Sequence, residues 1–191
     1  MFGKKPVPPQ AGSPRPAAAP PTPAAALPSG WLMQILTVDY VITGYFAPID
    51  MPLVGWLNVP TQTTITLNQA QVTALDPHTS LSAEIRAEVT VPKSRIVGVI
   101  PRDDAGLRST SVQMLPRVEW AIIHAGPFVL RACFRLAGEM PLRMLFGGVP
   151  ADMLVVSDAE IRTLRPETNF QPLKTPALVI SKSQVHAYYS A

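Results

Sequence analysis

The chain contains an internal repeat, and this feature constrains the fold most, because a duplicated segment is expected to fold twice in the same way. The residues Asp-Met-Pro-Leu at 50–53 recur as Glu-Met-Pro-Leu at 139–142. At this offset, segments 50–100 and 139–189 are identical at nine of 51 positions, against about three expected by chance. Upstream the offset becomes 88, so one residue is inserted before Glu139. We therefore interpret the sequence as a tandem duplication.

Each copy has the pattern of a mainly β domain with one short helix. Asp50 and Glu139 are expected to cap short helices that begin at the following prolines. The apolar alternation breaks at Asn68-Gln69 and at Ser157-Asp158, which indicates a β-bulge or tight turn at the same place in both copies. The last apolar runs, at 88–91 with 96–100 and at 178–180 with 185–189, are interpreted as two hairpins.

A copy of this length is close to the size at which a single core is marginal. We therefore expect two tandem small barrel- or roll-like repeats that pack as a pseudo-twofold pair. The expected boundaries are 31–102 for the first copy, 103–116 for a connector and 117–191 for the second copy. Within the connector, Asp103-Asp104 are interpreted as a solvated turn instead of a metal-binding pair.

Residues 1–30 differ in composition from the rest. They hold nine of the 22 prolines and seven alanines, and such a segment is expected to be a disordered, proline-rich tail. Lys4, Lys5 and Arg15 give this tail a charge of +3, equal to the charge of the whole chain. The remainder is therefore neutral, and we predict no nucleic-acid binding.

The remainder divides into two halves of opposite charge. Residues 31–115 hold five basic and seven acidic side chains, and residues 116–191 hold eight and six. The first half therefore has a net charge of −2 and the second of +2. This difference suits packing of copy on copy or of molecule on molecule, although ordinary scatter explains it equally well.

Cysteine content and hydropathy suggest a compartment. Cys133 is the only cysteine, which fits a reducing environment. Lys4 and Lys5 are followed by prolines instead of a continuous apolar stretch, and no run of 18 apolar residues occurs. We therefore expect no signal peptide, no transmembrane segment and a cytoplasmic location.

Four short motifs carry a resemblance to a known family. They are Ile42-Thr43-Gly44, Leu57-Asn58, the Leu-x-x-Ala-x-Val segment from Leu67, and the Val-x-Lys-x-x-Ile segment from Val91. Together they resemble a small bacterial mainly β domain family of unknown function. The second copy departs from the pattern, with Ala132 for the glycine and Gly147 for the asparagine. The resemblance implies the fold and brings no catalytic residue.

Residues able to support catalysis or bind metal are few and scattered. His78, His124 and His186 lack a second histidine or a cysteine at metal-ligand spacing. Cys133 alternates with two arginines on a strand, without a base nearby in the sequence. No nucleophile motif or nucleotide-binding glycine loop occurs. We therefore predict no catalytic residue, no metal site and no cofactor, and an enzyme remains an unsupported third hypothesis.

Three arginines distinguish the second copy. Arg131 and Arg135 are expected on one strand face, with Arg143 in the following helix, and the first copy has no arginine at these positions. They are candidates for binding an acidic partner, a phosphate or a neighbouring copy. The alternative is that they are solvated strand arginines.

These observations favour a non-catalytic interaction or assembly module with a flexible proline-rich tail. A protein partner or self-association is expected. The alternative hypothesis is a small-ligand or anion-binding regulatory domain that uses the cleft between the copies.

Overall fold

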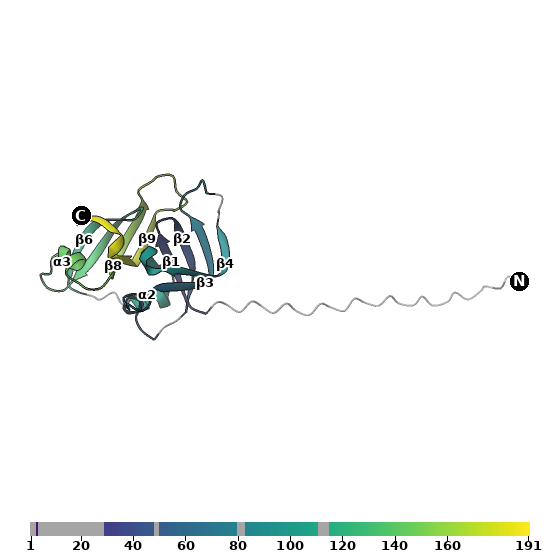
Figure 1. The fold of residues 1–191 in the computed structure, drawn as a ribbon, viewed down its shortest axis with the longest axis horizontal. Coiled ribbons are helices and arrows are strands. Elements are labelled where there is room, and N and C mark those ends of the chain that lie inside the picture. Colours follow the sequence, from purple (N-terminus) through teal and green to yellow (C-terminus); the bar gives the residue numbers. More distant parts are fainter. Residues whose placement is uncertain (1–2, 4–28, 48–49, 80–82, 111–114) are drawn as a thin grey trace.

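A computed structural model describes residues 3, 29–47, 50–79, 83–110 and 115–191. These residues form one ten-stranded antiparallel sheet with a few short helices, so the mainly β prediction is confirmed (Figure 1). Most of the proline-rich tail lies outside the described residues. No helix in the described part of the chain is long and apolar enough to cross a membrane.

The two halves of the molecule contain the same strands and short helices in the same order, except that α2 of the N-terminal half has no counterpart in the described part of the C-terminal half. The N-terminal half comprises β1 (Trp31–Thr37), β2 (Tyr40–Phe46), α1 (Leu53–Leu57), β3 (Thr64–Ala74), β4 (Glu84–Pro92), η1 (Lys93–Arg95), β5 (Ile96–Pro101) and α2 (Asp104–Thr110). The C-terminal half comprises β6 (Arg117–Ala125), β7 (Phe128–Leu136), α3 (Leu142–Gly147), β8 (Met153–Thr163), β9 (Leu173–Ser181), η2 (Lys182–Gln184) and β10 (Val185–Ser190).

The strand order across the sheet is β10-β6-β7-β8-β9-β5-β1-β2-β3-β4. The order within each half is the same, since β10-β6-β7-β8-β9 matches β5-β1-β2-β3-β4. The halves meet where β9 pairs with β5. These strands hold different positions in their halves, so the β9–β5 joint is head-to-tail. The sheet is not closed into a barrel, so the expected barrel- or roll-like repeats do not form closed barrels.

The two predicted hairpins are also wrong. β4 and β5 are joined only by η1, yet they lie at opposite edges of their half, and β5 pairs with β1. Three residues span at most about 10 Å, whereas five strands laid flat place their outer members about 19 Å apart. Each half must therefore curl strongly so that the short link can reach from edge to edge.

The predicted bulges are confirmed. Gln69 and Asp158 have positive φ angles of 47° and 51°, and the β2–β3 and β7–β8 registers shift at these positions. Opposite the first bulge, a Cβ on Gly44 would lie 3.0 Å from backbone atoms of Ala70 and Asn68. The glycine therefore permits the close approach of β2 to the bulged strand.

The short helices begin later than predicted, and neither acid caps them. α1 has Pro52 at its N-cap position and α3 has Pro141, and neither end carries a side-chain cap. The N–H of Leu53 donates instead to Ser109 Oγ of α2, at 3.1 Å. A proline one residue before the helix fixes an extended entry, which leaves Asp50 and Glu139 outside the first turn.

The connector contains a helix instead of a solvated turn. Asp103 precedes α2 and accepts hydrogen bonds from Gly106 N–H at 2.7 Å and from Leu32 N–H at 2.7 Å. The carboxylate therefore caps α2 and ties it to β1. Residues 111–114 of the predicted connector lie outside the described part of the chain.

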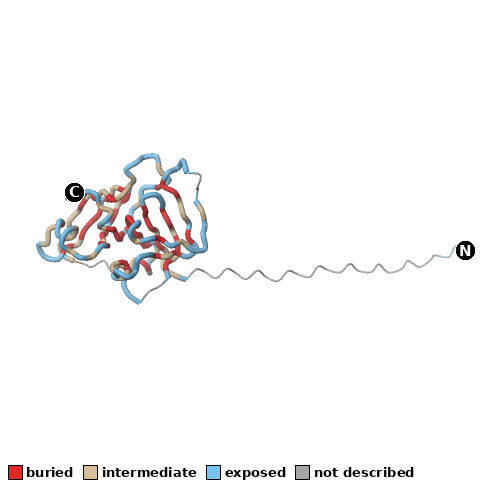
Figure 2. The backbone as a smooth tube through the Cα atoms, in the orientation of Figure 1, coloured by how far each residue is buried: buried red, intermediate tan, exposed pale blue. Residues whose placement is uncertain are grey.

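Two hydrophobic clusters form the core, and each includes residues from both halves. One is built mainly from the C-terminal half, with Leu36, Val41, Leu75, Val97 and Ile100 added from the N-terminal half. The other is built mainly from the N-terminal half, with Met153 and Val179 added. Burial is concentrated along the central strands, whereas β4 is mostly exposed (Figure 2). The two halves therefore share their cores across the joint.

Candidate interaction site at the joint and the free sheet edges

Backbone pairing between β5 and β9 holds the halves together. Gly98 lies opposite Ile180, and Val99 lies opposite Val179. Within the C-terminal half, Lys182 N–H donates to Asp152 O at 2.8 Å, so these two residues form a hydrogen-bonded pair that continues the β8–β9 ladder. Bonded and non-bonded pairs alternate along an antiparallel ladder, so Val179, three residues earlier, forms a non-bonded pair with β8. The polar backbone groups of Val179 therefore point away from β8 and toward β5.

A close approach at Gly98 makes this pairing possible. A Cβ built on Gly98 would lie 2.9 Å from Leu178 Cδ1 and 3.3 Å from Val179 O. An added Cβ would therefore require the side chain of Leu178 to shift and Val179 O to move by a few tenths of an ångström. The strand pair can approach this closely because glycine occupies the contact point.

Side-chain amides add three further links between the halves. The amide of Asn58 donates to Met153 O at 3.0 Å and accepts from Met153 N–H at 2.9 Å. Asn169 Nδ2 donates to Ala74 O at 3.0 Å, and Gln184 Nε2 donates to Ser94 O at 3.0 Å. Such bonds each contribute about 0.5–1.5 kcal/mol, so the joint is fixed by directional contacts as well as by apolar burial.

Lys93 braces the N-terminal half near this joint. Its Nζ donates to Leu57 O and Val59 O, both at 2.9 Å, and lies 5.5 Å from the centre of the Trp56 ring. Burial lowers the pKa of Lys93, and the nearby charge of Asp152 opposes that shift. The matching Lys182 binds Val149 O in the other half, so the two lysines make similar contacts with backbone carbonyl groups.

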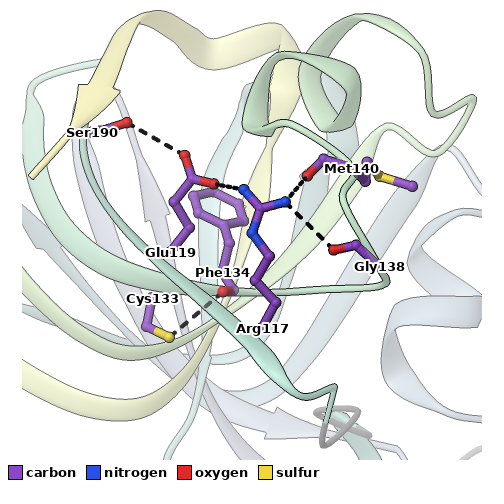
Figure 3. Close-up of polar contacts among 7 residues, drawn as sticks. All are labelled: Arg117, Glu119, Cys133, Phe134, Gly138, Met140 and Ser190. Atoms are coloured by element: carbon purple, nitrogen blue, oxygen red, sulfur yellow. Dashed lines mark hydrogen bonds and ion pairs between the residues drawn. The ribbon is translucent and has the colours of Figure 1, made fainter.

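The loop that carries the second copy of the opening motif is held by Arg117. Its guanidinium donates to Met140 O at 3.0 Å, to Gly138 O at 3.5 Å and to Glu119 Oε2 at 2.8 Å (Figure 3). Ser190 Oγ of β10 donates to the other oxygen of Glu119 at 3.3 Å. Sequence analysis missed this network, because its members are brought together only by the sheet.

The arginines that distinguish the second copy lie on two elements. Arg131 and Arg135 share β7, and Arg143 lies on α3. The guanidinium of Arg131 lies 4.5 Å from the centre of the Trp120 ring, and Arg131 faces Glu160 across the β7–β8 ladder. The guanidinium of Arg131 therefore already makes contacts within the molecule. Their role in binding a partner or an anion remains a prediction.

Glu160 is an acid that lies opposite Arg131 on the neighbouring strand. A hydrogen bond from Arg162, whose Nε lies 3.0 Å from Glu160 Oε1, lowers the pKa of the carboxyl. The charges of Lys174 and Arg131 act in the same direction. The carboxylate is thus held in its charged form on the outer face of the sheet.

The residues considered for catalysis or metal binding are dispersed. Cys133 is buried, and its Sγ contacts Phe134 O at 3.8 Å (Figure 3). The ring of His124 lies 6.0 Å from that of Tyr189. In the described part of the chain, no three His, Cys, Asp or Glu side chains are grouped closely enough to hold a metal ion.

A cavity of about 1030 Å³ lies between the halves at one end of the sheet. His78 and His186 line it from opposite halves, although they are far apart in the sequence. The N-terminal half contributes Asp39 and Asp76, and the C-terminal half contributes Arg165 and Glu167, among apolar neighbours. Among the charged side chains that line this cavity, the carboxylates outnumber the arginine.

The outer edges of the sheet are β4 and β10, each of which pairs with one neighbouring strand. Figure 1 shows β4 at one side of the molecule and the C-terminus, where β10 ends, at the other. Exposed apolar side chains lie at both edges, with Ile85 80% exposed on β4 and Tyr189 55% exposed on β10. Unpaired backbone groups beside such side chains are able to receive another strand.

Comparison with protein-family models, curated proteins and solved structures found no match to this chain.

Proposed function

We propose that this protein is a non-catalytic interaction or assembly module, built from two tandem copies of one β domain and extended by a proline-rich tail. The observation that carries this proposal is the β5–β9 joint. It joins one domain to the next through complementary strand edges, and it leaves one edge of each kind free at the ends of the sheet.

Several structural correspondences support duplication as the origin of the halves. The strand order agrees, and the residues with positive φ, Gln69 and Asp158, lie 89 positions apart. Lys93 and Lys182, again 89 apart, both bind carbonyl groups in the segment after the short helix. The resemblance to a bacterial family and the cytoplasmic location belong to the same proposal and rest on the sequence.

Affinity capture with the full-length protein, a 31–191 variant and an edge variant tests this function. Thr90→Pro removes a backbone donor from the free β4 edge, and Thr90→Val is the matched control that keeps it. Partners lost with Thr90→Pro belong to the edge, and partners lost on truncation belong to the tail. Capture profiles that are the same for all four proteins would contradict an assembly role.

The cavity between the halves favours a second function, binding of a small ligand. Its volume of about 1030 Å³ is close to the upper end of the range usual for ligand pockets. The acidic groups Asp39, Asp76 and Glu167 outnumber Arg165, so a ligand with a cationic group fits better than the anion suggested by the sequence.

Thermal unfolding in the presence of small amines and of small carboxylates tests the second function. A ligand present at 100 times its Kd stabilises the folded state by about 2.7 kcal/mol. The amines should raise Tm, and Asp39→Asn with Asp76→Asn should abolish the rise. No shift with any compound, or a shift with carboxylates only, would contradict a cation-binding cavity.

A further inference from the structure

The free edges of the sheet correspond, residue by residue, to the two strands that meet inside the molecule. Because the halves share one strand order, β4 occupies the position of β9, and β10 occupies that of β5. On the edge of β4, Thr90 takes the place of Val179 and Val91 that of Ile180. On the edge of β10, Tyr188 and Ala187 take the places of Val99 and Gly98.

The backbone groups at both edges point outward at the required positions. Lys93 N–H donates to Thr63 O at 2.9 Å, so by alternation the polar backbone groups of Thr90 face away from β3. Ala191 N–H donates to Trp120 O at 2.9 Å, so those of Tyr188 face away from β6. The donors and acceptors used inside the molecule by Val179 and Val99 are thus repeated at its two ends.

Side chains beside β10 hold the positions of those that make apolar contacts at the internal joint. Five residues of the N-terminal half pack into the other core: Leu36, Val41, Leu75, Val97 and Ile100. Their counterparts, which we call the outer patch, are His124, Val129, Leu164, His186 and Tyr189. Leu164 is 54% exposed and Tyr189 is 55% exposed. Leu164 and His186 also line the cavity between the halves of the same molecule, so the part of the outer patch that a second molecule can cover lies at His124, Val129 and Tyr189.

We propose that the chain associates with further copies of itself, head to tail, through antiparallel pairing of β4 in one molecule with β10 in the next. Tyr188 would lie opposite Thr90, and Ala187 opposite Val91, in the register of the internal joint. This inference rests on the proposed assembly function and names its partner. Each molecule offers one edge of each kind, so the association extends into a closed ring or a filament.

Charge and size complementarity agree with this partner. The half that carries β4 has a net charge of −2, and the half that carries β10 has a net charge of +2, so unlike halves of neighbouring molecules meet. Ala187 is the smallest residue after glycine and stands where Gly98 permits the close approach of β9. Arg95 takes the place of Gln184 and keeps a donor for the carbonyl of Ser183, the counterpart of Ser94.

The intermolecular joint is weaker than the internal one. Gly147 replaces Asn58, so the amide that binds the facing strand is missing. Thr64 and Thr90 replace the apolar Met153 and Val179. Fewer hydrogen bonds and less apolar burial make the association reversible and dependent on protein concentration.

Sedimentation velocity of the full-length protein over a range of concentrations tests the inference. Thr90→Pro blocks the β4 edge, and Ala187→Arg blocks the β10 edge by filling the point of close approach. The matched controls are Thr90→Val, which keeps the backbone donor, and Val118→Arg, which adds the same charge at an exposed site on β6. Circular dichroism checks that all four variants are folded.

We expect the unmodified protein and both controls to form species larger than a monomer, and each blocked variant to be monomeric. An equimolar mixture of Thr90→Pro and Ala187→Arg should form a dimer with one molecule of each, because each supplies the edge that the other lacks. A dimer of either blocked variant alone would overturn head-to-tail pairing, since it would require two like edges to meet.

A protein that stays monomeric up to about 1 mM would overturn self-association. The capture experiment then separates this failure from that of the proposed function. If Thr90→Pro still loses a partner that Thr90→Val retains, the β4 edge binds a different protein and the assembly function stands. If neither experiment shows an effect of the edge, both proposals fail.

Discussion

The internal joint and the free edges are formed by strands at equivalent positions in the two halves. At the joint, β9 and β5 pair with each other, whereas their counterparts β4 and β10 each have one edge that is unpaired among the described residues. At the joint, all six residues of β5 are buried, whereas β10, its counterpart, has no buried residue. β9 has five consecutive buried residues at its end, whereas β4 has one in its whole length. The difference shows how much of the burial in a β domain depends on what lies beside its edge strand.

The sequence differences between these positions follow the burial. The joint has Val179, Gly98 and Asn58 where the edges have Thr90, Ala187 and Gly147. The edge residues are compatible with both water and a neighbouring strand, whereas the joint residues require the neighbour. Pro92 and the Glu84–Arg86 ion pair on β4 are devices that discourage indiscriminate pairing at an edge.

The largest difference in the free energy of unfolding should appear between two single variants, each with proline at the equivalent position of one half. Val179→Pro removes the donor that faces β5 and leaves its partner buried, which should lower the free energy of unfolding by roughly 3 kcal/mol. Thr90→Pro should change it by less than about 0.5 kcal/mol, because its donor faces the open edge. Urea denaturation of both variants measures this, and equal losses would contradict the comparison.

A second pair of variants tests the point of close approach. Gly98→Leu overpacks the contact with Leu178 and should cost about 1–3 kcal/mol. In a protein of this size that lowers Tm by about 2–4 °C for each kcal/mol. Ala187→Leu should leave Tm of the monomer unchanged, because the edge of β10 away from β6 has no strand beside it in the described part of the chain. Differential scanning calorimetry at low protein concentration distinguishes the two, and a matched fall in Tm would be the contrary result.

The side-chain amide of Asn58, at the end of α1, can be removed in one variant and introduced at the equivalent position of the other half in a second variant. Asn58→Ala removes two hydrogen bonds to Met153 and should lower the free energy of unfolding by about 2 kcal/mol. Gly147→Asn supplies the missing amide at the proposed intermolecular joint between β4 and β10. A Cβ added to Gly147 meets nothing within 4 Å. It should tighten self-association about fivefold, for one further hydrogen bond of about 1 kcal/mol. Sedimentation equilibrium measures the second effect, and weaker association would contradict it.

The smallest effect concerns an ion pair outside both joints. The pKa of Glu160 is lowered in the folded state, so its stabilising contribution is present above the unfolded pKa and is lost as pH falls through the folded pKa. Arg162→Gln should raise the pKa of Glu160 toward its ordinary value and weaken the acid dependence of stability. NMR titration of the Glu160 carboxyl measures this, and an unchanged midpoint would exclude Arg162 as the cause.

The local predictions succeeded where a pattern has a local cause. The broken alternation at Gln69 and Asp158 indicated the bulges, because an inserted residue reverses which side chains face the core. The short helices were found, but their caps were misassigned, since Ser109, from a distant segment, supplies the acceptor for Leu53. The cap of α2 at Asp103 was not predicted, because Asp103-Asp104 were interpreted as a solvated turn, and the bond from Leu32 N–H to Asp103 depends on the tertiary structure.

The long-range predictions failed for a different reason. The sequence contains two apolar runs separated by Pro-Lys-Ser-Arg, and a hairpin is the simplest way to join them. The curl of the sheet instead brings the opposite edge within reach of η1, so β5 pairs with β1. The candidate arginines were placed on the correct strand and helix, but the sequence did not show that Arg131 faces Trp120 and Glu160.

The sequence by itself determined that the chain is mainly β and where its strands bulge. These features depend on residue type and spacing along the chain. Only the tertiary structure decided that the two halves join head to tail through β5 and β9, and that β4 and β10 are the edge strands of the sheet formed by the described residues. Strand pairing depends on backbone groups that every residue carries. The neighbour of each strand is therefore set by the curvature of the sheet and by side-chain burial, and not by the amino-acid sequence of the strand alone.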